Sequence, residues 1–202
     1  MTDLKANRSI RAAVVAALSL PLLITAAVPA QAQTRVHVEN PNFNLPSVEQ
    51  LGVAFHTVTV GSPEMPGWSV THGNVDVYGR GAAQAPTGTQ ALSLNGTVPG
   101  TVIQSLETTP GSTVTVTWLQ SPDTWTGCPV GAGQIYSAGV TDTNGPMPEL
   151  FNPGAPTAAG KWTYASMTFT ARRYLTTLEF ASLNNGGACG PLITQIVAYE
   201  NT

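Results

Sequence analysis

The stretch Ser112-Thr113-Val114-Thr115-Val116-Thr117-Trp118-Leu119 decides the fold of this 202-residue chain. Its threonines alternate with Val114, Val116 and Trp118. Successive side chains of a strand point to opposite faces of a sheet, so this alternation predicts a half-buried β-strand. We expect the two valines and the tryptophan on the inner face of the sheet and the threonines on the outer face.

Similar runs recur along the chain, whereas no stretch keeps a helical period. The longest further candidates are Lys161–Thr170, Thr176–Ser182 and Leu192–Tyr199. The shorter candidates are His56–Val60, Trp68–Thr71, Val75–Tyr78, Gln90–Leu94, Thr101–Leu106 and Ile135–Val140. Turn sequences such as Asn95-Gly96 and Pro110-Gly111 separate them. About ten short strands without helices between them predict an all-β fold, either an antiparallel β-sandwich or a jelly roll.

The first 32 residues have the three parts of a secretory signal peptide. Lys5, Arg8 and Arg11 form a positive segment, an apolar run follows over 12–28, and Ala30-Gln31-Ala32 is a small-x-small cleavage site. We therefore predict a signal peptide over 1–32 and one mature domain over 33–202. The alternative is a retained membrane anchor. An anchor needs about 20 apolar residues, but a serine, a proline and a threonine interrupt this run.

Charged side chains make up only 9% of the chain, against about 25% in an ordinary soluble domain. Eight basic and eleven acidic residues give a net charge of −3, and signal cleavage removes three basic residues and one acidic residue, which changes it to −5. Without a basic excess we expect no nucleic-acid partner. We also expect no membrane association after cleavage, because no second apolar run of spanning length follows. The prediction is a secreted, extracellular bacterial protein.

The chain has two cysteines, Cys128 and Cys189. In an oxidising compartment such a pair predicts one disulfide. The loop that it closes is about 60 residues long and contributes about 4 kcal/mol in the chain-entropy account. Neither cysteine has a histidine or another cysteine at metal-ligand spacing, so we predict no metal at these residues.

A series of short motifs follows in a fixed order along the mature chain. The motifs are Pro66-Gly67-Trp68-Ser69-Val70, Gly73-Asn74-Val75-Asp76-Val77-Tyr78-Gly79, Gly88-Thr89-Gln90-Ala91-Leu92-Ser93-Leu94-Asn95-Gly96, Pro99-Gly100-Thr101-Val102-Ile103-Gln104, Thr109-Pro110-Gly111-Ser112-Thr113-Val114, Trp162, Thr168-Phe169-Thr170-Ala171 and Gly190-Pro191. In these motifs the chain resembles bacterial choice-of-anchor C proteins, which are similar to plant cell-wall proteins of unknown function with galactose-binding-like jelly rolls. The resemblance covers Asn40 to Tyr199.

This resemblance implies a secreted or wall-associated galactose-binding-like β-sandwich that binds carbohydrate and has no catalytic residues. Many carbohydrate-binding jelly rolls hold a structural calcium with acidic residues near the start and the end of the domain. This chain has Asn44 and Thr194 in those places. Calcium prefers a set of oxygen ligands that includes carboxylates. The departure argues against a structural calcium there, and we predict no cofactor.

The residues form no recognisable catalytic motif. Ser137 lacks the glycine that precedes the serine of a nucleophile elbow, and the three histidines have no zinc-binding spacing. A glycosidase needs two carboxylates about 5–10 Å apart. The candidates are Asp76, Asp123, Asp142 and Glu149. Because surface-loop carboxylates are commonly only solvated, we predict that the protein is not an enzyme, with a small secreted hydrolase as the least favoured alternative.

Trp125 is the aromatic residue that the sequence best places to bind a sugar. It lies in the polar stretch Ser121-Pro122-Asp123-Thr124-Trp125-Thr126-Gly127-Cys128, next to the predicted disulfide. Sugar C–H faces stack on aromatic rings, and a ring on a fixed loop loses little entropy on binding. The predicted ligand-binding set is Trp125, Tyr136, Asp123, Asp142 and Asn144. The alternative is that Trp125 folds over the disulfide as a local mini-core.

The other three tryptophans, Trp68, Trp118 and Trp162, are predicted core residues, since large aromatic side chains dominate sandwich interiors. Asn95-Gly96-Thr97 matches a glycosylation sequon and also a hairpin turn, and we favour the turn. Together these observations predict a secreted, non-catalytic module that binds a cell-wall or extracellular polysaccharide. The alternative function is a protein-interaction or structural surface module that meets a wall or matrix protein.

Overall fold

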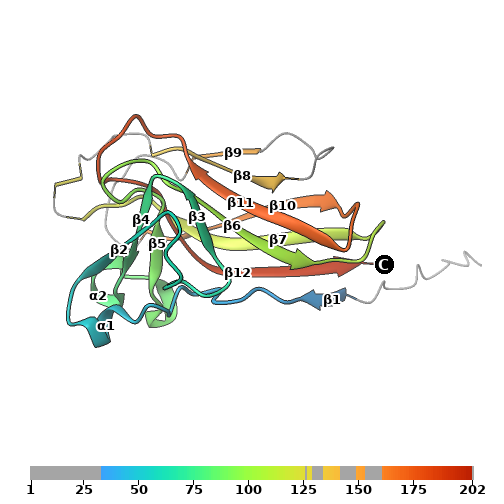
Figure 1. Cartoon of the computed structure of the whole chain (residues 1–202), viewed down its shortest axis with the longest axis horizontal. Coiled ribbons are helices and arrows are strands. Elements are labelled where there is room, and N and C mark those ends of the chain that lie inside the picture. Colours follow the sequence, from blue (N-terminus) through green and yellow to red (C-terminus); the bar gives the residue numbers. More distant parts are fainter. Residues whose placement is uncertain (1–32, 126, 129–133, 142–148, 153–160, 202) are drawn as a thin grey trace, which may run out of the picture. The chain divides into compact units, whose positions relative to one another are not determined.

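Two antiparallel β-sheets pack face to face in the computed structural model of the chain (Figure 1). The structure describes residues 33–125, 127–128, 134–141, 149–152 and 161–201. Within these ranges strands are the main regular elements and helices are short. The predicted all-β, antiparallel sandwich is therefore confirmed.

The larger sheet has seven strands in the order β10-β7-β12-β5-β4-β2, and β1 also pairs with β12. Its strands are β1 (Gln33–Val36), β2 (Phe55–Thr59), β4 (Asn74–Tyr78), β5 (Ala91–Ser93), β7 (Thr113–Ser121), β10 (Thr163–Thr170) and β12 (Leu192–Asn201). Strand β7 is the threonine-valine stretch, and Val114, Val116 and Trp118 are buried as predicted. It pairs with β10 on one side and β12 on the other.

The smaller sheet has five strands in the order β3-β6-β11-β8-β9. They are β3 (Ser69–His72), β6 (Thr101–Glu107), β8 (Tyr136–Thr141), β9 (Glu149–Phe151) and β11 (Leu175–Ser182). Three short helical turns lie between strands: α1 (Val48–Leu51), α2 (Arg80–Ala83) and the 3-10 turn η1 (Pro86–Gly88). None of the helices in the described part of the chain is long and apolar enough to cross a membrane.

Phe180 of β11 occupies the centre of the core between the two sheets. Its ring centroid lies 5.1 Å from that of Trp118, 6.1 Å from that of Trp68 and 6.4 Å from that of Tyr136. The polar atoms of these large rings have partners: Trp118 Nε1 donates to Tyr136 Oη at 2.8 Å, and Trp68 Nε1 donates to the carbonyl of Glu39 at 3.1 Å. The core positions predicted for Trp68 and Trp118 are confirmed.

Trp162 differs from its predicted core position. It lies one residue before β10 and is only partly buried, against a second small apolar cluster that contains Tyr78 and Leu192. Its Nε1 donates to the carbonyl of Gln84 at 3.1 Å. Residue 162 has the same strand parity as Tyr164, which is 82% exposed, so its side chain does not point into the space between the sheets.

The disulfide between Cys128 and Cys189 is present, as predicted. It joins the loop after β7 to the loop before β12, 61 residues further along the chain. Beside the second loop, Asn95 is fully buried, and its side-chain amide donates to the carbonyl of Gly187 at 2.9 Å. A Cβ atom at Gly190 would lie 2.6 Å from the Cβ of Asn95, which explains why this position is glycine. The sequon lies in a bend closed by a bridge between Asn95 and Pro99, with Asn95 buried and Thr97 exposed. The predicted hairpin is not formed, because β5 pairs with β4 and β12 and not with β6.

Removal of the disulfide is expected to destabilise the protein. The double variant Cys128→Ser/Cys189→Ser should lose several degrees in Tm, because the unfolded chain regains the freedom that the cross-link removes, worth about 4 kcal/mol in the chain-entropy account. Calorimetry of the oxidised protein, the reduced protein and the variant measures this loss. Two free thiols in the untreated exported protein would contradict the cross-link itself.

Truncation of Phe180 is expected to destabilise the sandwich far more than truncation of an exposed ring. Phe180→Ala should cost about 3–5 kcal/mol, because it leaves a cavity between the two sheets. The matched control Tyr164→Ala removes an aromatic ring that is 82% exposed and should change the free energy of unfolding by about 0.5 kcal/mol or less. Urea unfolding of both variants gives the two values, and equal losses would show that Phe180 is not the central core residue.

Candidate functional site

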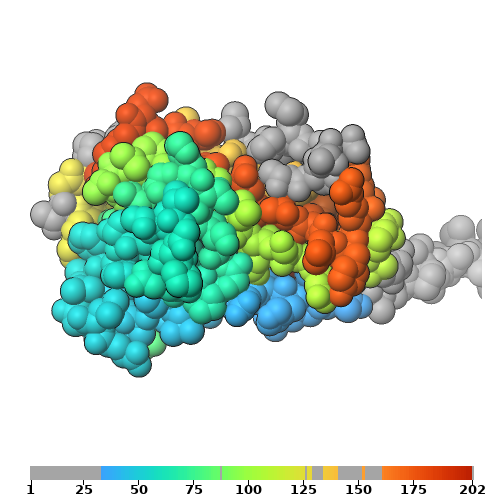
Figure 2. Space-filling view, viewed as in Figure 1, coloured from blue at the N-terminus to red at the C-terminus, as the bar shows by residue number. Residues whose placement is uncertain are grey.

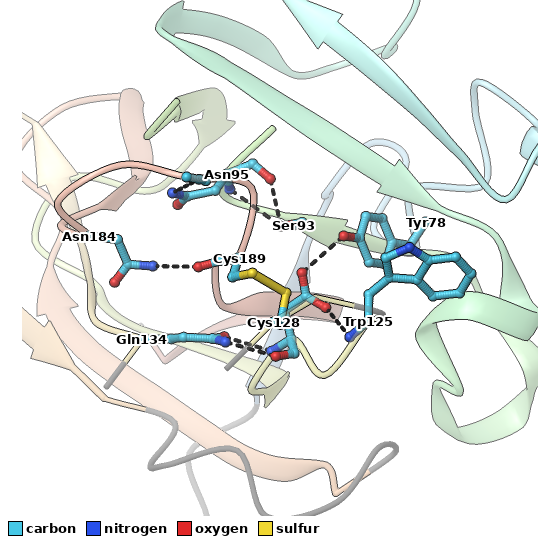
Figure 3. Close-up of a disulfide and its surroundings, with 10 residues drawn as sticks. Tyr78, Ser93, Asn95, Trp125, Cys128, Gln134, Asn184 and Cys189 are labelled. Carbon is cyan, nitrogen blue, oxygen red and sulfur yellow. Dashed lines mark hydrogen bonds between the residues drawn. A yellow bond between two sulfur atoms is a disulfide. The ribbon is translucent and has the colours of Figure 1, made fainter. Parts of the chain in front are cut away.

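The loop that follows β7 holds Trp125 in place through its backbone (Figure 3). The N–H of Trp125 donates to Asp123 Oδ1 at 2.8 Å, and the N–H of Cys128 donates to the carbonyl of Trp125, also at 2.8 Å. The disulfide then ties Cys128 to Cys189. Trp125 therefore sits between a buried carboxylate and a covalent cross-link.

The ring of Trp125 packs on Tyr78, and Figure 3 shows the two rings together. Their centroids are 6.2 Å apart with an interplanar angle of 66°, which is an edge-on contact. Trp125 nevertheless keeps 36% of its surface exposed. The Trp125 ring therefore contacts Tyr78 and also keeps an accessible surface. This arrangement lies between the two alternatives from the sequence, a ring exposed for sugar binding and a ring folded into a local mini-core.

A second exposed ring, that of Phe55, lies on β2, which pairs with the strand that carries Tyr78. Phe55 of β2 pairs directly with Tyr78 of β4, and their ring centroids are 5.8 Å apart. Phe55 is 41% exposed, whereas Tyr78 is 3% exposed. Phe55 and Trp125 thus both contact one buried tyrosine. Phe55 has no local signal in the sequence that marks it as a site residue, because only the pairing of β2 with β4 brings it next to Tyr78.

Asp123 is the polar centre of the site and is 1% exposed. Tyr78 Oη donates to Asp123 Oδ2 at 2.9 Å, while the Asp123 backbone exchanges two hydrogen bonds with the side-chain amide of Gln134, at 2.6 and 2.8 Å. Burial raises the pKa of Asp123 above its ordinary value, although the hydrogen bonds from Trp125 and Tyr78 oppose this shift. Burial and the nearby Asp123 carboxylate raise the pKa of Tyr78.

Asp76 of β4 is a second buried acid on the same strand as Tyr78. It is 3% exposed, and the hydroxyl of Thr57 donates to its Oδ1 at 2.6 Å. Burial raises its pKa, and its charge acts on both Asp123 and Tyr78. The expectation that these carboxylates are solvated surface groups is therefore wrong for Asp76 and Asp123, because strand pairing and loop closure enclose both of them.

The structure separates the predicted binding residues. Asp123 and Trp125 are together, but Tyr136 lies in the core with no exposed surface, where its Oη accepts from Trp118 and donates to Gln120. Burial raises the pKa of Tyr136. No part of its side chain is accessible to a ligand, since Phe180 and Trp118 cover it. Asp142 and Asn144 lie outside the described residues.

The two positions considered for calcium have other surroundings. The hydroxyl of Thr194 donates to the carbonyl of Gln90 at 2.8 Å, and Asn44 is exposed. Among the residues that the structure describes, no group of three or more His, Cys, Asp or Glu side chains is arranged to hold a metal ion. Thr194 instead joins β12 to the segment before β5.

The raised pKa of Asp123 predicts that this residue makes the protein less stable as pH rises. The folded state holds the Asp123 proton more tightly than the unfolded chain, whose pKa is near 3.8. The stability that the residue contributes is therefore present below that value and is lost as pH rises through the folded pKa. Asparagine can still accept from Trp125 N–H and donate to Tyr78.

Urea unfolding of the wild type and of Asp123→Asn between pH 3 and pH 7 tests this. The wild type should lose stability relative to the variant as pH rises, and the difference should become constant above the folded pKa. A stability difference that does not change with pH would contradict the raised pKa.

Several solved structures are similar to this chain at low sequence identity. A family 35 carbohydrate-binding module from Clostridium thermocellum is 10% identical, with 83% of this chain and 97% of that chain covered and a TM-score of 0.44. A family 35 module from Cellvibrio japonicus is 15% identical, with 73% and 94% covered and a TM-score of 0.47. A family 4 carbohydrate-binding module is 13% identical, with 82% and 100% covered and a TM-score of 0.46.

A comparison with curated proteins finds no significant match. A family described as "Protein of unknown function (DUF642)" matches residues 36–198, which include the smaller sheet, the disulfide and the larger sheet except most of β1 and the end of β12. The chain therefore belongs to the DUF642 family of proteins of unknown function.

Proposed function

We propose that this protein is a secreted, non-catalytic module that binds a cell-wall or extracellular polysaccharide at Trp125. The observation that carries the proposal is the state of the Trp125 ring: its backbone is fixed by Asp123 and Cys128, its inner edge rests on Tyr78, and 36% of its surface is exposed. An aromatic ring that is ordered before binding offers a stacking surface to a sugar at low entropic cost.

Phe55, which also contacts Tyr78, extends this stacking surface. Because Phe55 and Trp125 both contact Tyr78 and both remain partly exposed, a chain of linked sugars can contact both rings. Asp142 and Asn144 stay predicted hydroxyl-binding residues of this site. The resemblance to choice-of-anchor C proteins and secretion after cleavage at Ala32 also stay predictions, and a disulfide-linked domain is consistent with an oxidising compartment.

The burial of Asp76 and Asp123 supports a binding role over hydrolysis. A glycosidase acid must reach the glycosidic oxygen, whereas these two residues are 3% and 1% exposed. Their carboxylate oxygens already accept hydrogen bonds from Thr57, Tyr78 and Trp125. We therefore assign Asp123 to the support of Trp125 and Tyr78, whereas Asp76 joins β4 to Thr57 of β2.

A protein-interaction role is the second candidate function, and one observation favours it. Several large apolar residues near α1 are about half exposed: Leu45 (50%), Leu51 (51%), Val53 (50%) and Phe55 (41%). Exposed apolar residues that are close together mark protein interfaces more often than scattered ones do. Phe55 belongs to both candidate surfaces, so a test must separate Trp125 from these aliphatic residues.

Trp125→Ala should reduce the affinity for a bound glycan about tenfold, which corresponds to the loss of one aromatic contact. Isothermal titration calorimetry with soluble xylan, galactan and β-glucan measures the affinities. Tyr164→Ala is the matched control, because Tyr164 is 82% exposed and lies on β10. This control should bind as the wild type does.

Two results would count against the proposal. One is a wild type that binds none of these polymers in a saturable way. The other is a Trp125→Ala variant that binds them unchanged. A stoichiometric protein partner that Leu51→Ser/Val53→Ser releases and Trp125→Ala does not would favour the interaction module instead.

A further inference from the structure

A polar hollow of about 270 Å³ lies beside β1 and β12, and it does not involve Trp125. Arg35 of β1 lines it together with Asn42, Thr89 and Gln195. The volume is slightly below the range of about 300–1,000 Å³ that is usual for small-molecule sites. A hollow of this size suits a single sugar unit of a longer chain. Strand β1, blue in Figure 2, lies at the surface of the molecule.

The walls of this hollow are held in place by hydrogen bonds between distant segments. The N–H of Ile196 donates to the carbonyl of Pro41 at 3.0 Å, and the side-chain amide of Gln195 donates to the carbonyl of Pro86 at 3.1 Å. The hydroxyl of Thr194 also donates to Gln90, as described above. These contacts join β12 to the two loop segments that form the rest of the rim, so the segments that carry Asn42, Thr89 and Gln195 are held together before a ligand arrives.

A local irregularity of β12 borders the hollow. The pairing of β12 with β7 shifts between Thr194 and Val197, and Gln195 has a φ of 54°, in the left-handed region that non-glycine residues rarely occupy. β-Bulges are frequent next to binding sites, where they turn a side chain away from the regular strand. Here the bulge brings Gln195 to the rim of the hollow.

Arg35 gives the hollow its charge. Its side chain makes no hydrogen bond or ion pair with any other residue that the structure describes, and no acidic residue lines the hollow. The guanidinium group presents a planar set of donors that matches a carboxylate. Arg35 and Arg80 are both exposed, but Arg80 has Glu49 nearby, with Nε and Oε1 3.8 Å apart.

Tyr199 extends the surface next to Arg35. The two residues are direct partners in the pairing of β1 with β12, so their side chains share the outer face of the sheet. Tyr199 is 37% exposed. Its ring offers a stacking surface for the sugar unit that follows the one in the hollow.

We infer that this hollow, which we call the Arg35 site, is a second carbohydrate subsite that binds a sugar unit carrying a carboxylate. Arg35 pairs with the carboxylate, Asn42, Thr89 and Gln195 pair with hydroxyls, and Tyr199 stacks on the neighbouring unit. The inference rests on the proposed carbohydrate-binding function but uses a surface separate from Trp125. It assigns the module a preference for acidic over neutral polysaccharides.

The test compares polygalacturonate with its fully methyl-esterified form, which has the same backbone without the charge. Isothermal titration calorimetry at low salt should show that the wild type binds the acid form about tenfold more tightly, the lower end of what one charge-assisted hydrogen bond contributes. Arg35→Gln should abolish this preference. Arg172→Gln, which removes the same charge from an exposed position between β10 and β11, should keep it.

Additional variants separate this inference from the proposed function. Asn42→Ala should weaken the binding of both forms, while Trp125→Ala should leave the ratio between them unchanged. No preference in a wild type whose Trp125-dependent binding is intact would overturn the Arg35 site alone. An equal loss of the preference for the acid form in Arg35→Gln and Arg172→Gln would also overturn the Arg35 site. Such a result would indicate an unspecific attraction of the acidic polymer to positive charge. Failure of every polymer to bind would overturn both proposals.

Discussion

The contact between Trp118 and Phe180 is the interaction on which the rest of the structure depends. Trp118 belongs to the larger sheet and Phe180 to the smaller one, and their ring centroids are 5.1 Å apart in an edge-on arrangement. Aromatic pairs of this kind combine a large buried apolar area with a favourable ring geometry. Because Trp118 also donates to Tyr136 on β8, the same residue fixes the relative position of two strands in the opposite sheet. The hydrogen bond between Trp118 and Tyr136 joins β7 near its end to the beginning of β8. The loop that carries Trp125 follows β7 directly.

The site around Trp125 shows how a mostly uncharged protein uses its few acids. Only 9% of the residues are charged, yet Asp76 and Asp123 are both placed inside the protein. A buried carboxylate destabilises the fold unless donors surround it, and Thr57, Tyr78 and Trp125 supply those donors. The hydrogen bonds that stabilise the buried Asp123 carboxylate therefore also fix the orientation of the loop that carries Trp125. The disulfide adds a covalent constraint five residues after Asp123.

Alternation in the sequence was sufficient to predict the strands with a clear buried face. Strands β7, β10, β11 and β12 contain such alternation, and each was predicted within two residues at its ends. Strands β1 and β9 were not predicted. β1 has one buried residue, Val36, and β9 is three residues long, so neither carries a periodic signal. Each of them forms by pairing with a longer strand: β1 pairs with β12, and β9 pairs with β8.

The candidate site was predictable only in part, for a related reason. The disulfide was predictable because the chain has only two cysteines. The local sequence around Trp125 indicated a candidate binding loop, and its role in binding stays a prediction. The burial of Tyr136 depends on Phe180 from another strand, and the contribution of Phe55 depends on its register with Tyr78. Contacts between residues that are far apart in sequence leave no trace in either local segment. The Arg35 site has the same character, since its walls come from β1, β12 and two separate loops.

The position of β12 has a consequence for how the domain is made. Strand β12 lies inside the larger sheet and pairs with β1, β5 and β7. These three strands therefore have no common partner strand until residues 192–201 are synthesised. Loop closure over such long separations slows folding. A chain from which residues 192–201 have not yet emerged therefore cannot complete the larger sheet.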